Sequence, residues 1–179
     1  MNASQTSKRI AFCGVLGALA VVVLALGGIV PFATFSCPVL AMFLLLPVIA
    51  EFGCGTAVVF YIAVALLGLL LSPDKEIACF FAFLGYYPIL KQKLDRISSK
   101  LFRVIVKFLV FNVAITAMYA LLLFVLRMDA LAQEFADTSR ILLIGLYLLG
   151  NATFFICDLA LQRWMYLYLC RYRKKLFHD

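Results

Sequence analysis

The chain has 179 residues, of which 66% are hydrophobic and only 14% are charged, and its mean hydropathy is +1.08. About half of the residues in a soluble domain are apolar, so this composition excludes an ordinary soluble protein and indicates an integral membrane protein. The formal net charge of +7 is compatible with nucleic-acid binding, but in a membrane protein the position of the cations matters more than their number.

Hydropathy and helix-breaking residues predict six membrane-spanning segments, since one span needs about 20 apolar residues. We therefore expect an all-α integral membrane protein, a single transmembrane domain over 1–179 that forms a bundle of six transmembrane helices. The second and fourth segments are short, and Pro47 and Pro88 are expected to kink or end their helices. The expected spans are about 10–32, 38–50, 55–72, 77–90, 101–126 and 141–161.

The first segment follows Lys8 and Arg9 and could be taken for a signal peptide, which also begins with cations before an apolar run. Its apolar run is longer than the about 7–15 residues usual in a signal peptide, and no convincing cleavage site ends it. We interpret it as a retained first helix.

The lysines and arginines are distributed unevenly between the two sides of the membrane. If all six segments cross, 13 of the 16 lie on the side of both termini, and only Lys75, Arg127 and Arg140 lie on the other. Cations accumulate on the cytoplasmic side, so both termini are expected there, in a prokaryotic plasma membrane with anionic headgroups as partners. If the second and fourth segments are re-entrant instead, only four helices cross. The connector from Asp74 to Glu76 then moves to the cytoplasmic side.

Polar side chains at membrane depth are costly, and so they mark candidate sites. Each of the last two segments carries three along one helical face: Asn112, Thr116 and Tyr119 in the fifth, and Tyr147, Asn151 and Asp158 in the sixth. Two such faces on antiparallel helices can line a solute cavity open to the outside, with both asparagines near the midplane. The alternative is that they hold the bundle together by interhelical hydrogen bonds. We expect Asp158 to be structural, capping a helix or pairing with a cation such as Arg103 or Arg163.

Two further candidates for solute contact lie near the predicted helix ends. Tyr86 precedes Pro88, whose missing N–H leaves a carbonyl group that a ligand can satisfy, unless the proline simply ends the helix. Phe35 and Phe32 lie in the first outer loop, where they either cap a ligand or belong to an interfacial aromatic belt.

Signatures of enzymes and metal sites are missing from the sequence. The six cysteines occur singly, without a C-x-x-C pair, and the one histidine is His178 near the end, so no metal and no cofactor are expected. No H-E-x-x-H, G-x-S-x-G or glycine-rich phosphate loop occurs. These absences favour a protein without catalytic residues.

The first segment carries small residues near its cytoplasmic end. Gly14 and Ala18 are four residues apart, and Gly17 widens the flat patch that they form. In lipid, small residues let two helix backbones approach closely, which is a main source of helix affinity. The patch serves either a partner helix or packing inside the protein.

The stretch KRIAFCGVLGALA, six expected spans in 179 residues, cytoplasmic termini and polar faces on the last two helices resemble one known family. This family is the substrate-binding S components of energy-coupling factor (ECF) transporters, which typically carry Ala-xxx-Ala where this chain has Gly14-xxx-Ala18. The resemblance implies a non-enzymatic subunit that captures a small micronutrient or vitamin-like molecule from outside. Its cavity would be built from the first outer loop and the fourth to sixth helices.

The resemblance also implies partners. The patch of Gly14, Gly17 and Ala18 would dock on an energy-coupling transmembrane subunit, which is joined to two cytoplasmic ATPase subunits that hydrolyse ATP. Two other classes stay open: a small membrane enzyme acting on lipid or isoprenoid substrates through Asp158 and nearby cations, and an assembly subunit of a membrane complex.

Overall fold

A computed structural model of the chain describes residues 3–29, 33–126 and 139–172. These residues are helical apart from short connections, and none of them forms a strand, so the predicted all-α fold is confirmed. Four helices are long and apolar enough to cross a membrane: Thr6–Gly27, Ser36–Leu71, Lys100–Val125 and Ile141–Cys170. They support the prediction of a membrane protein with transmembrane helices.

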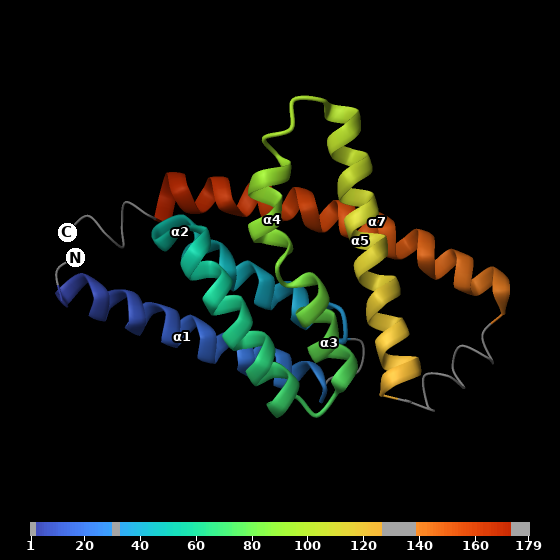
Figure 1. The fold of residues 1–179 in the computed structure, drawn as a ribbon, viewed down its shortest axis with the longest axis horizontal. Coiled ribbons are helices and arrows are strands. Elements are labelled where there is room, and N and C mark those ends of the chain that lie inside the picture. Colours follow the sequence, from blue (N-terminus) through green and yellow to red (C-terminus); the bar gives the residue numbers. More distant parts are fainter. Residues whose placement is uncertain (1–2, 30–32, 127–138, 173–179) are drawn as a thin grey trace.

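Helix α2 (Ser36–Leu71) consists of two arms that reverse direction at Gly53, as Figure 1 shows. Gly53 has φ 77° and ψ 176°, a conformation that is essentially restricted to glycine. The reversal falls between the second and third predicted segments. Pro47 lies inside the first arm, whose backbone stays helical until Gly53, so the helix does not end at this proline.

Helix α1 (Ala3–Gly27) packs against both arms of α2. The Phe12 and Phe52 ring centroids are 5.7 Å apart at one end, and a Cβ on Gly27 would lie 2.8 Å from Cys37 Cβ at the other. The first arm therefore runs antiparallel to α1.

The second arm of α2 runs parallel to α1. A Cβ on Gly17 would lie 3.5 Å from the Phe60 ring, and a Cβ on Gly68 would lie 3.0 Å from Leu24. The residue numbers thus rise in the same direction along α1 and the second arm. Since α1 packs against both arms, the three helices form one unit.

The fourth predicted segment forms two short helices, α3 (Lys75–Leu84) and α4 (Tyr87–Leu94). The Asp74 carboxylate caps α3 by accepting a hydrogen bond of 2.8 Å from the Glu76 amide. Pro88 lies in the first turn of α4, where its missing N–H costs nothing, and the predicted segment is interrupted at Gly85 and Tyr86 just before it, as expected of a proline that kinks or ends a helix.

Together α3 and α4 run back along the second arm of α2. Tyr61 donates a hydrogen bond to the carbonyl of Ala82, and Cys54 Sγ lies 3.3 Å from Gln92 Oε1. The two short helices thus cover the arm along most of its length.

The last two long helices cross each other, and their far ends diverge (Figure 1). Helix α5 (Lys100–Ala120) continues into the π-helical turn η1 (Leu121–Val125), and α7 (Arg140–Leu167) continues into η2 (Tyr168–Tyr172), beyond the predicted end at 161. Ser99 and Ser139 cap α5 and α7, each accepting a backbone hydrogen bond of 3.4 Å.

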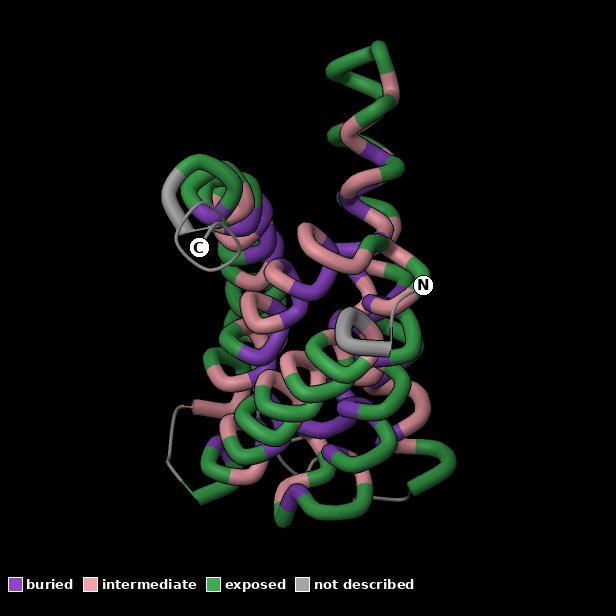
Figure 2. Tube along the Cα trace, turned by 90° about the vertical axis from the view of Figure 1, so that its left-hand side faces the viewer, coloured by how far each residue is buried: buried purple, intermediate pink, exposed green. Residues whose placement is uncertain are grey.

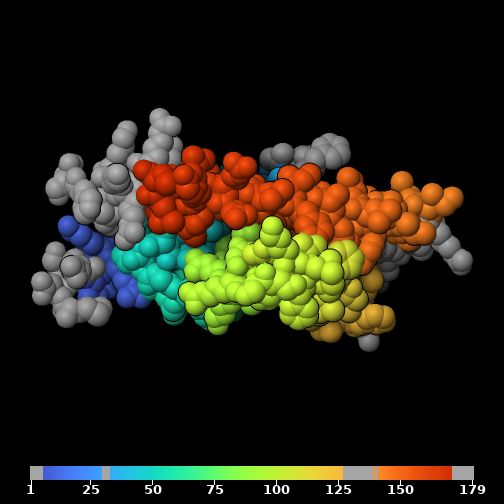
Figure 3. All heavy atoms as spheres, turned by 90° about the horizontal axis from the view of Figure 1, so that it is seen from above, coloured from blue at the N-terminus to red at the C-terminus, as the bar shows by residue number. Residues whose placement is uncertain are grey.

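The apolar core lies between α1, α2, α3 and the inner faces of α5 and α7, where Figure 2 shows the buried parts of the trace. Helix α7 contributes little to it. Much of its outer surface is apolar and exposed, as at Ile141, Ile144 and Ile156, which is expected of a helix that faces lipid. Figure 3 shows α7 as a ridge along one side of the molecule, next to α2 and the surface formed by α4 and α5.

Candidate functional site

Two asparagines meet where α5 crosses α7. Asn112 Nδ2 donates to Asn151 Oδ1 at 2.9 Å, and Asn151 Nδ2 donates to Asn112 Oδ1 at 3.3 Å. Each amide also donates to the carbonyl four residues earlier in its own helix, at 2.8 Å to Phe108 and 2.9 Å to Tyr147. The two predicted polar faces therefore do meet, and at this point they make interhelical hydrogen bonds.

The other members of the two polar faces lie in different surroundings. Thr116 and Tyr147 are exposed, whereas the Tyr119 hydroxyl donates to Glu76 Oε1 on α3 at 2.9 Å. Tyr119 thus joins α5 to α3 and does not face Asn151. That all of these residues contact the same bound solute stays a prediction.

The two aromatic candidates also have neighbours of their own. The ring of half-buried Tyr86 lies 6.3 Å from that of Tyr61, and the ring of Phe35 lies 5.4 Å from that of Phe80. Phe32 lies outside the described residues. Phe35 is 49% exposed, so its ring is accessible at the start of α2.

Asp158 on α7 is the centre of a buried charge cluster. Its Oδ1 accepts hydrogen bonds from the Tyr87 hydroxyl at 2.6 Å and from the Lys91 ammonium, and its Oδ2 accepts one from Lys107 Nζ at 2.9 Å. Asp95 completes the cluster, with carboxylate oxygens 2.7 Å from Lys107 Nζ and 3.5 Å from Lys91 Nζ. Two carboxylates thus balance two ammonium groups contributed by α4 and α5.

The structural role expected for Asp158 agrees with this geometry, but the expected partners were wrong. Arg103 donates instead to the backbone carbonyl of Asp95 at 3.1 Å, and Arg163 is exposed. Lys91 and Lys107 occupy the place beside Asp158 instead. Their side chains turn inward and are only 8% and 7% exposed. A buried carboxylate without such partners would be strongly destabilising.

The sequence did contain a signal for one of these partners. Lys107 is the one cation among the apolar residues between Arg103 and Arg127, so its ammonium needs a carboxylate if it turns inward.

A second candidate site is a groove between α1 and the second arm of α2. Its volume is about 520 Å³, and its floor includes Gly14, Gly17 and Ala18. Gly14 and Ala18 are exposed, and no atom of the described residues other than its own helix backbone and chain neighbours lies within 4 Å of the place where Gly14 would carry a Cβ. Gly17 packs internally against Phe60, so only part of the patch is used inside the protein.

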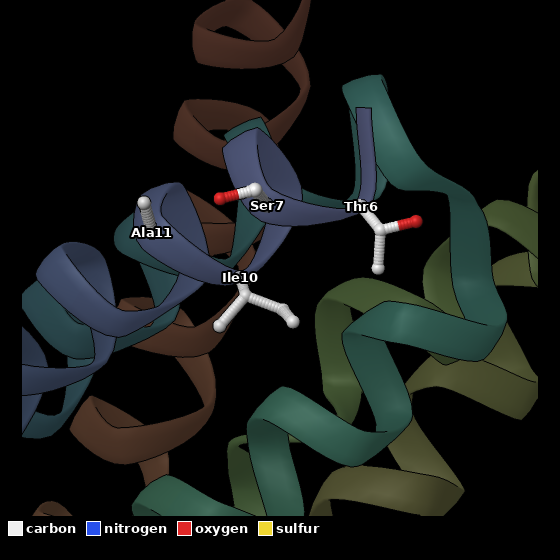
Figure 4. Close-up of a pocket in the computed structure, with 4 residues that line it drawn as sticks. All are labelled: Thr6, Ser7, Ile10 and Ala11. Carbon is white, nitrogen blue, oxygen red and sulfur yellow. The ribbon is translucent and has the colours of Figure 1, made fainter. Parts of the chain in front are cut away.

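One end of this groove is polar. Arg9 donates a hydrogen bond to the Thr56 hydroxyl and its guanidinium lies 5.9 Å from the centre of the Phe52 ring. An adjoining hollow of about 530 Å³ lies at the first turns of α1, where Figure 4 shows its four lining residues: Thr6, Ser7, Ile10 and Ala11. The remaining walls of the groove are apolar, among them Val59, Ala63 and Leu67.

Comparisons with protein-family models, curated proteins and solved structures gave no match to this chain. Within the described residues, no group of three His, Cys, Asp or Glu side chains is arranged to hold a metal ion. Any functional assignment therefore depends on the residues of this chain and their geometry.

Proposed function

We propose that the protein is the solute-binding subunit of an ECF-type importer. It captures a small micronutrient or vitamin-like molecule from outside and docks on an energy-coupling transmembrane subunit that is joined to two cytoplasmic ATPases. The observation that carries the proposal is the open groove over Gly14 and Ala18 on α1. A small-residue pair used only for internal packing would be covered by another helix.

The proposal includes six membrane passes with both termini in the cytoplasm. The two arms of α2, 36–52 and 54–71, are each about 26 Å long at 1.5 Å per residue, and α3 with α4 spans about 30 Å, close to the thickness of a bilayer core. The reversal at Gly53 and the antiparallel course of α3 and α4 support six alternating passes. The distribution of 13 cations against three favours the cytoplasmic side for both termini, although several of them, such as Arg127 and Lys174, lie outside the described residues.

The groove supports a helical partner because of its shape and chemistry. With glycine and alanine on the floor and apolar walls on α2, a second helix can bring its backbone close to α1 and gain dispersion contacts that lipid tails provide less well. In the proposed topology the Arg9 end of the groove lies near the cytoplasmic surface, where the ATPases of such a complex are located.

The solute site of the proposal lies in the outer half, where α5 and α7 diverge (Figure 1). Thr116 and Tyr147 are exposed and lie one helical turn from the paired asparagines, which are at the crossing. Tyr119 on α5, Tyr86 before α4 and Phe35 before α2 are the further proposed contacts.

The test is purification from native membranes under mild detergent, with identification of co-purified small molecules and proteins by mass spectrometry. The proposal expects a vitamin-like molecule together with a transmembrane subunit and two ATPases. A preparation that carries neither, from cells grown in rich and in vitamin-limited medium, contradicts it and favours an assembly subunit.

The charge cluster favours a second candidate, a small membrane enzyme acting on lipid or isoprenoid substrates. Asp158, Lys107 and Tyr87 bring an acid, an ammonium group and a phenol within hydrogen-bond distance, a combination suited to acid–base chemistry. In this structure, however, both oxygens of Asp158 already accept hydrogen bonds from the protein. A lipid or isoprenoid as the co-purified molecule would favour this candidate over the importer.

A further inference from the structure

Helix α7 is attached to the rest of the protein in an unusual way. Its apolar side chains are largely exposed, whereas its polar side chains Asn151 and Asp158 are 7% exposed each and point at α4 and α5. In lipid, the free energy of an apolar helix differs little between one position along its neighbour and another, because lipid tails are as apolar as its side chains. Beside the two buried apolar side chains Phe154 and Leu161, the buried polar groups are therefore what distinguishes one position of α7 from another.

Asp158 satisfies its hydrogen bonds in only one placement of α7. A shift by one helical turn moves the carboxylate by about 5.4 Å along the helix axis. The long side chains of Lys91 and Lys107 can follow such a movement. Tyr87 cannot, because its hydroxyl is carried by a rigid ring that is buried at 2% exposure on α4, so it cannot follow Asp158 from the present distance of 2.6 Å.

A second contact on the same face agrees with this placement. Asn112 and Lys107 on α5 pair with Asn151 and Asp158 on α7, so the order of partners is antiparallel and both contacts form together. Between them Phe111 stacks on Phe154 with ring centroids 4.4 Å apart. Shifting α7 would break the charge contact and the amide contact at once.

We propose that the cluster of Tyr87, Lys91, Lys107 and Asp158 is a register lock that holds α7 at one position along α4 and α5. Contacts between apolar surfaces alone would give several positions of α7 similar free energies. The charge cluster selects one of these positions. A single buried polar contact is known to select helix register elsewhere, at some cost in stability. This inference does not depend on the proposed transport function.

The test measures the position of α7 at a site remote from the cluster. Phe43 on α2 and Trp164 on α7 have ring centroids 6.0 Å apart, so cysteines at these two positions report the native register. Cysteine pairs 43–160 and 43–168 report shifts of one turn either way. All pairs are placed in the full chain with its six native cysteines replaced by alanine, and the rates of disulfide formation in membranes are compared.

The decisive variant replaces the whole lock by apolar side chains of similar size: Tyr87→Phe, Lys91→Met, Lys107→Met and Asp158→Leu. With the lock intact, the 43–164 pair should form its disulfide several-fold faster than the two shifted pairs. In the apolar variant the three rates should converge while the protein stays monodisperse. Retention of the 43–164 preference in that variant would overturn the proposal. The matched control is Thr153→Ala, an exposed polar position on α7 outside the lock, which should change none of the rates.

A second measurement covers the case in which the apolar variant does not fold. Asp158→Ala leaves Lys91 and Lys107 without this carboxylate, and formate is small enough to take its place. Sodium formate should raise the melting temperature of Asp158→Ala and restore the 43–164 preference, whereas sodium chloride at equal concentration should not. Equal responses to the two salts, or no response to either, contradict a lock that depends on a carboxylate at this position.

Discussion

Asn112 on α5 and Asn151 on α7 exchange two side-chain hydrogen bonds at the point where their helices cross. The pair is the centre of the polar faces that the sequence predicted. Two roles of its amide groups are to be distinguished by experiment. The amides can serve a solute that binds above them, or they can serve only the contact between the helices.

Substituting either asparagine by leucine should therefore impair solute binding more than it impairs folding. Either substitution removes both interhelical hydrogen bonds, each of which contributes about 0.6 kcal/mol in a membrane protein, and the remaining amide keeps its bond to its own helix. Solute binding and thermal stability are to be measured for Asn112→Leu, Asn151→Leu and the double variant, with Thr153→Ala as control. Aggregation of both single variants on size-exclusion chromatography would show that the pair mainly holds the helices together.

The groove on α1 should be sensitive to bulk at two positions. Gly14→Leu with Ala18→Phe fills open space, so the protein should fold and bind its solute but lose the energy-coupling subunit and uptake. The control is Val15→Phe with Leu19→Phe, at exposed positions of α1 that do not line the groove. Uptake and co-purification that survive in the groove variant would remove the main support for the transporter assignment.

Gly17 should respond differently from its neighbour Gly14. A Cβ at Gly17 already lies 3.5 Å from the Phe60 ring, so Gly17→Leu should clash with α2 and lower the melting temperature, whereas Gly14→Leu alone should not. Thermal unfolding in detergent distinguishes the two. Equal melting temperatures for both variants would show that α1 and α2 are packed differently.

The proposed topology places Lys75 outside and Lys93 in the cytoplasm. Both side chains are exposed, so cysteines at these positions, in a background without native cysteines, should be accessible to maleimides. In intact cells a membrane-impermeant maleimide should label position 75 and not position 93, and cell lysis should expose both. Labelling of position 75 only after lysis would support four spans with two re-entrant segments.

The reversal of α2 should depend on glycine at one position. Gly53→Ala forces a Cβ into a backbone conformation with φ 77° and should cost about 1–3 kcal/mol of stability. Gly55→Ala is the matched control, because Gly55 is helical with open space around it, and there alanine should be neutral or stabilising. The difference in melting temperature between the two variants measures the strain, and no difference would show that the reversal does not require glycine.

Local patterns predicted the helices and much of their order. The helical spacing of polar residues placed Asn112 and Asn151 on facing surfaces, and the boundary between the second and third predicted segments coincides with the reversal of α2. Pro88 marked the interruption of the fourth predicted segment, and it lies in the first turn of the helix that follows, where its missing N–H costs nothing.

Local patterns could not predict the charge cluster as a whole, although the position of Lys107 within an apolar stretch was one signal for it. By sequence alone Lys91 and Lys107 resemble the cations that mark the cytoplasmic side. Whether such a lysine extends to the headgroups or turns inward depends on a carboxylate far away in the sequence, here Asp158. Likewise Tyr119 shares a helical face with Asn112, yet its hydroxyl donates a hydrogen bond to Glu76, because α5 passes close to α3 at Tyr119.

The separation of Asp158 from Lys91 and Lys107, by 67 and 51 residues of sequence, has a consequence for biosynthesis. Lys91 and Lys107 leave the ribosome well before the carboxylate that neutralises them, so during synthesis their ammonium groups have only Asp95 and the lipid headgroups as counterions. In the proposed topology they lie on the cytoplasmic half, where long lysine side chains can reach the headgroups. The arrival of α7 then replaces headgroups by Asp158, and insertion of α7 becomes the step that withdraws both lysines from the membrane surface.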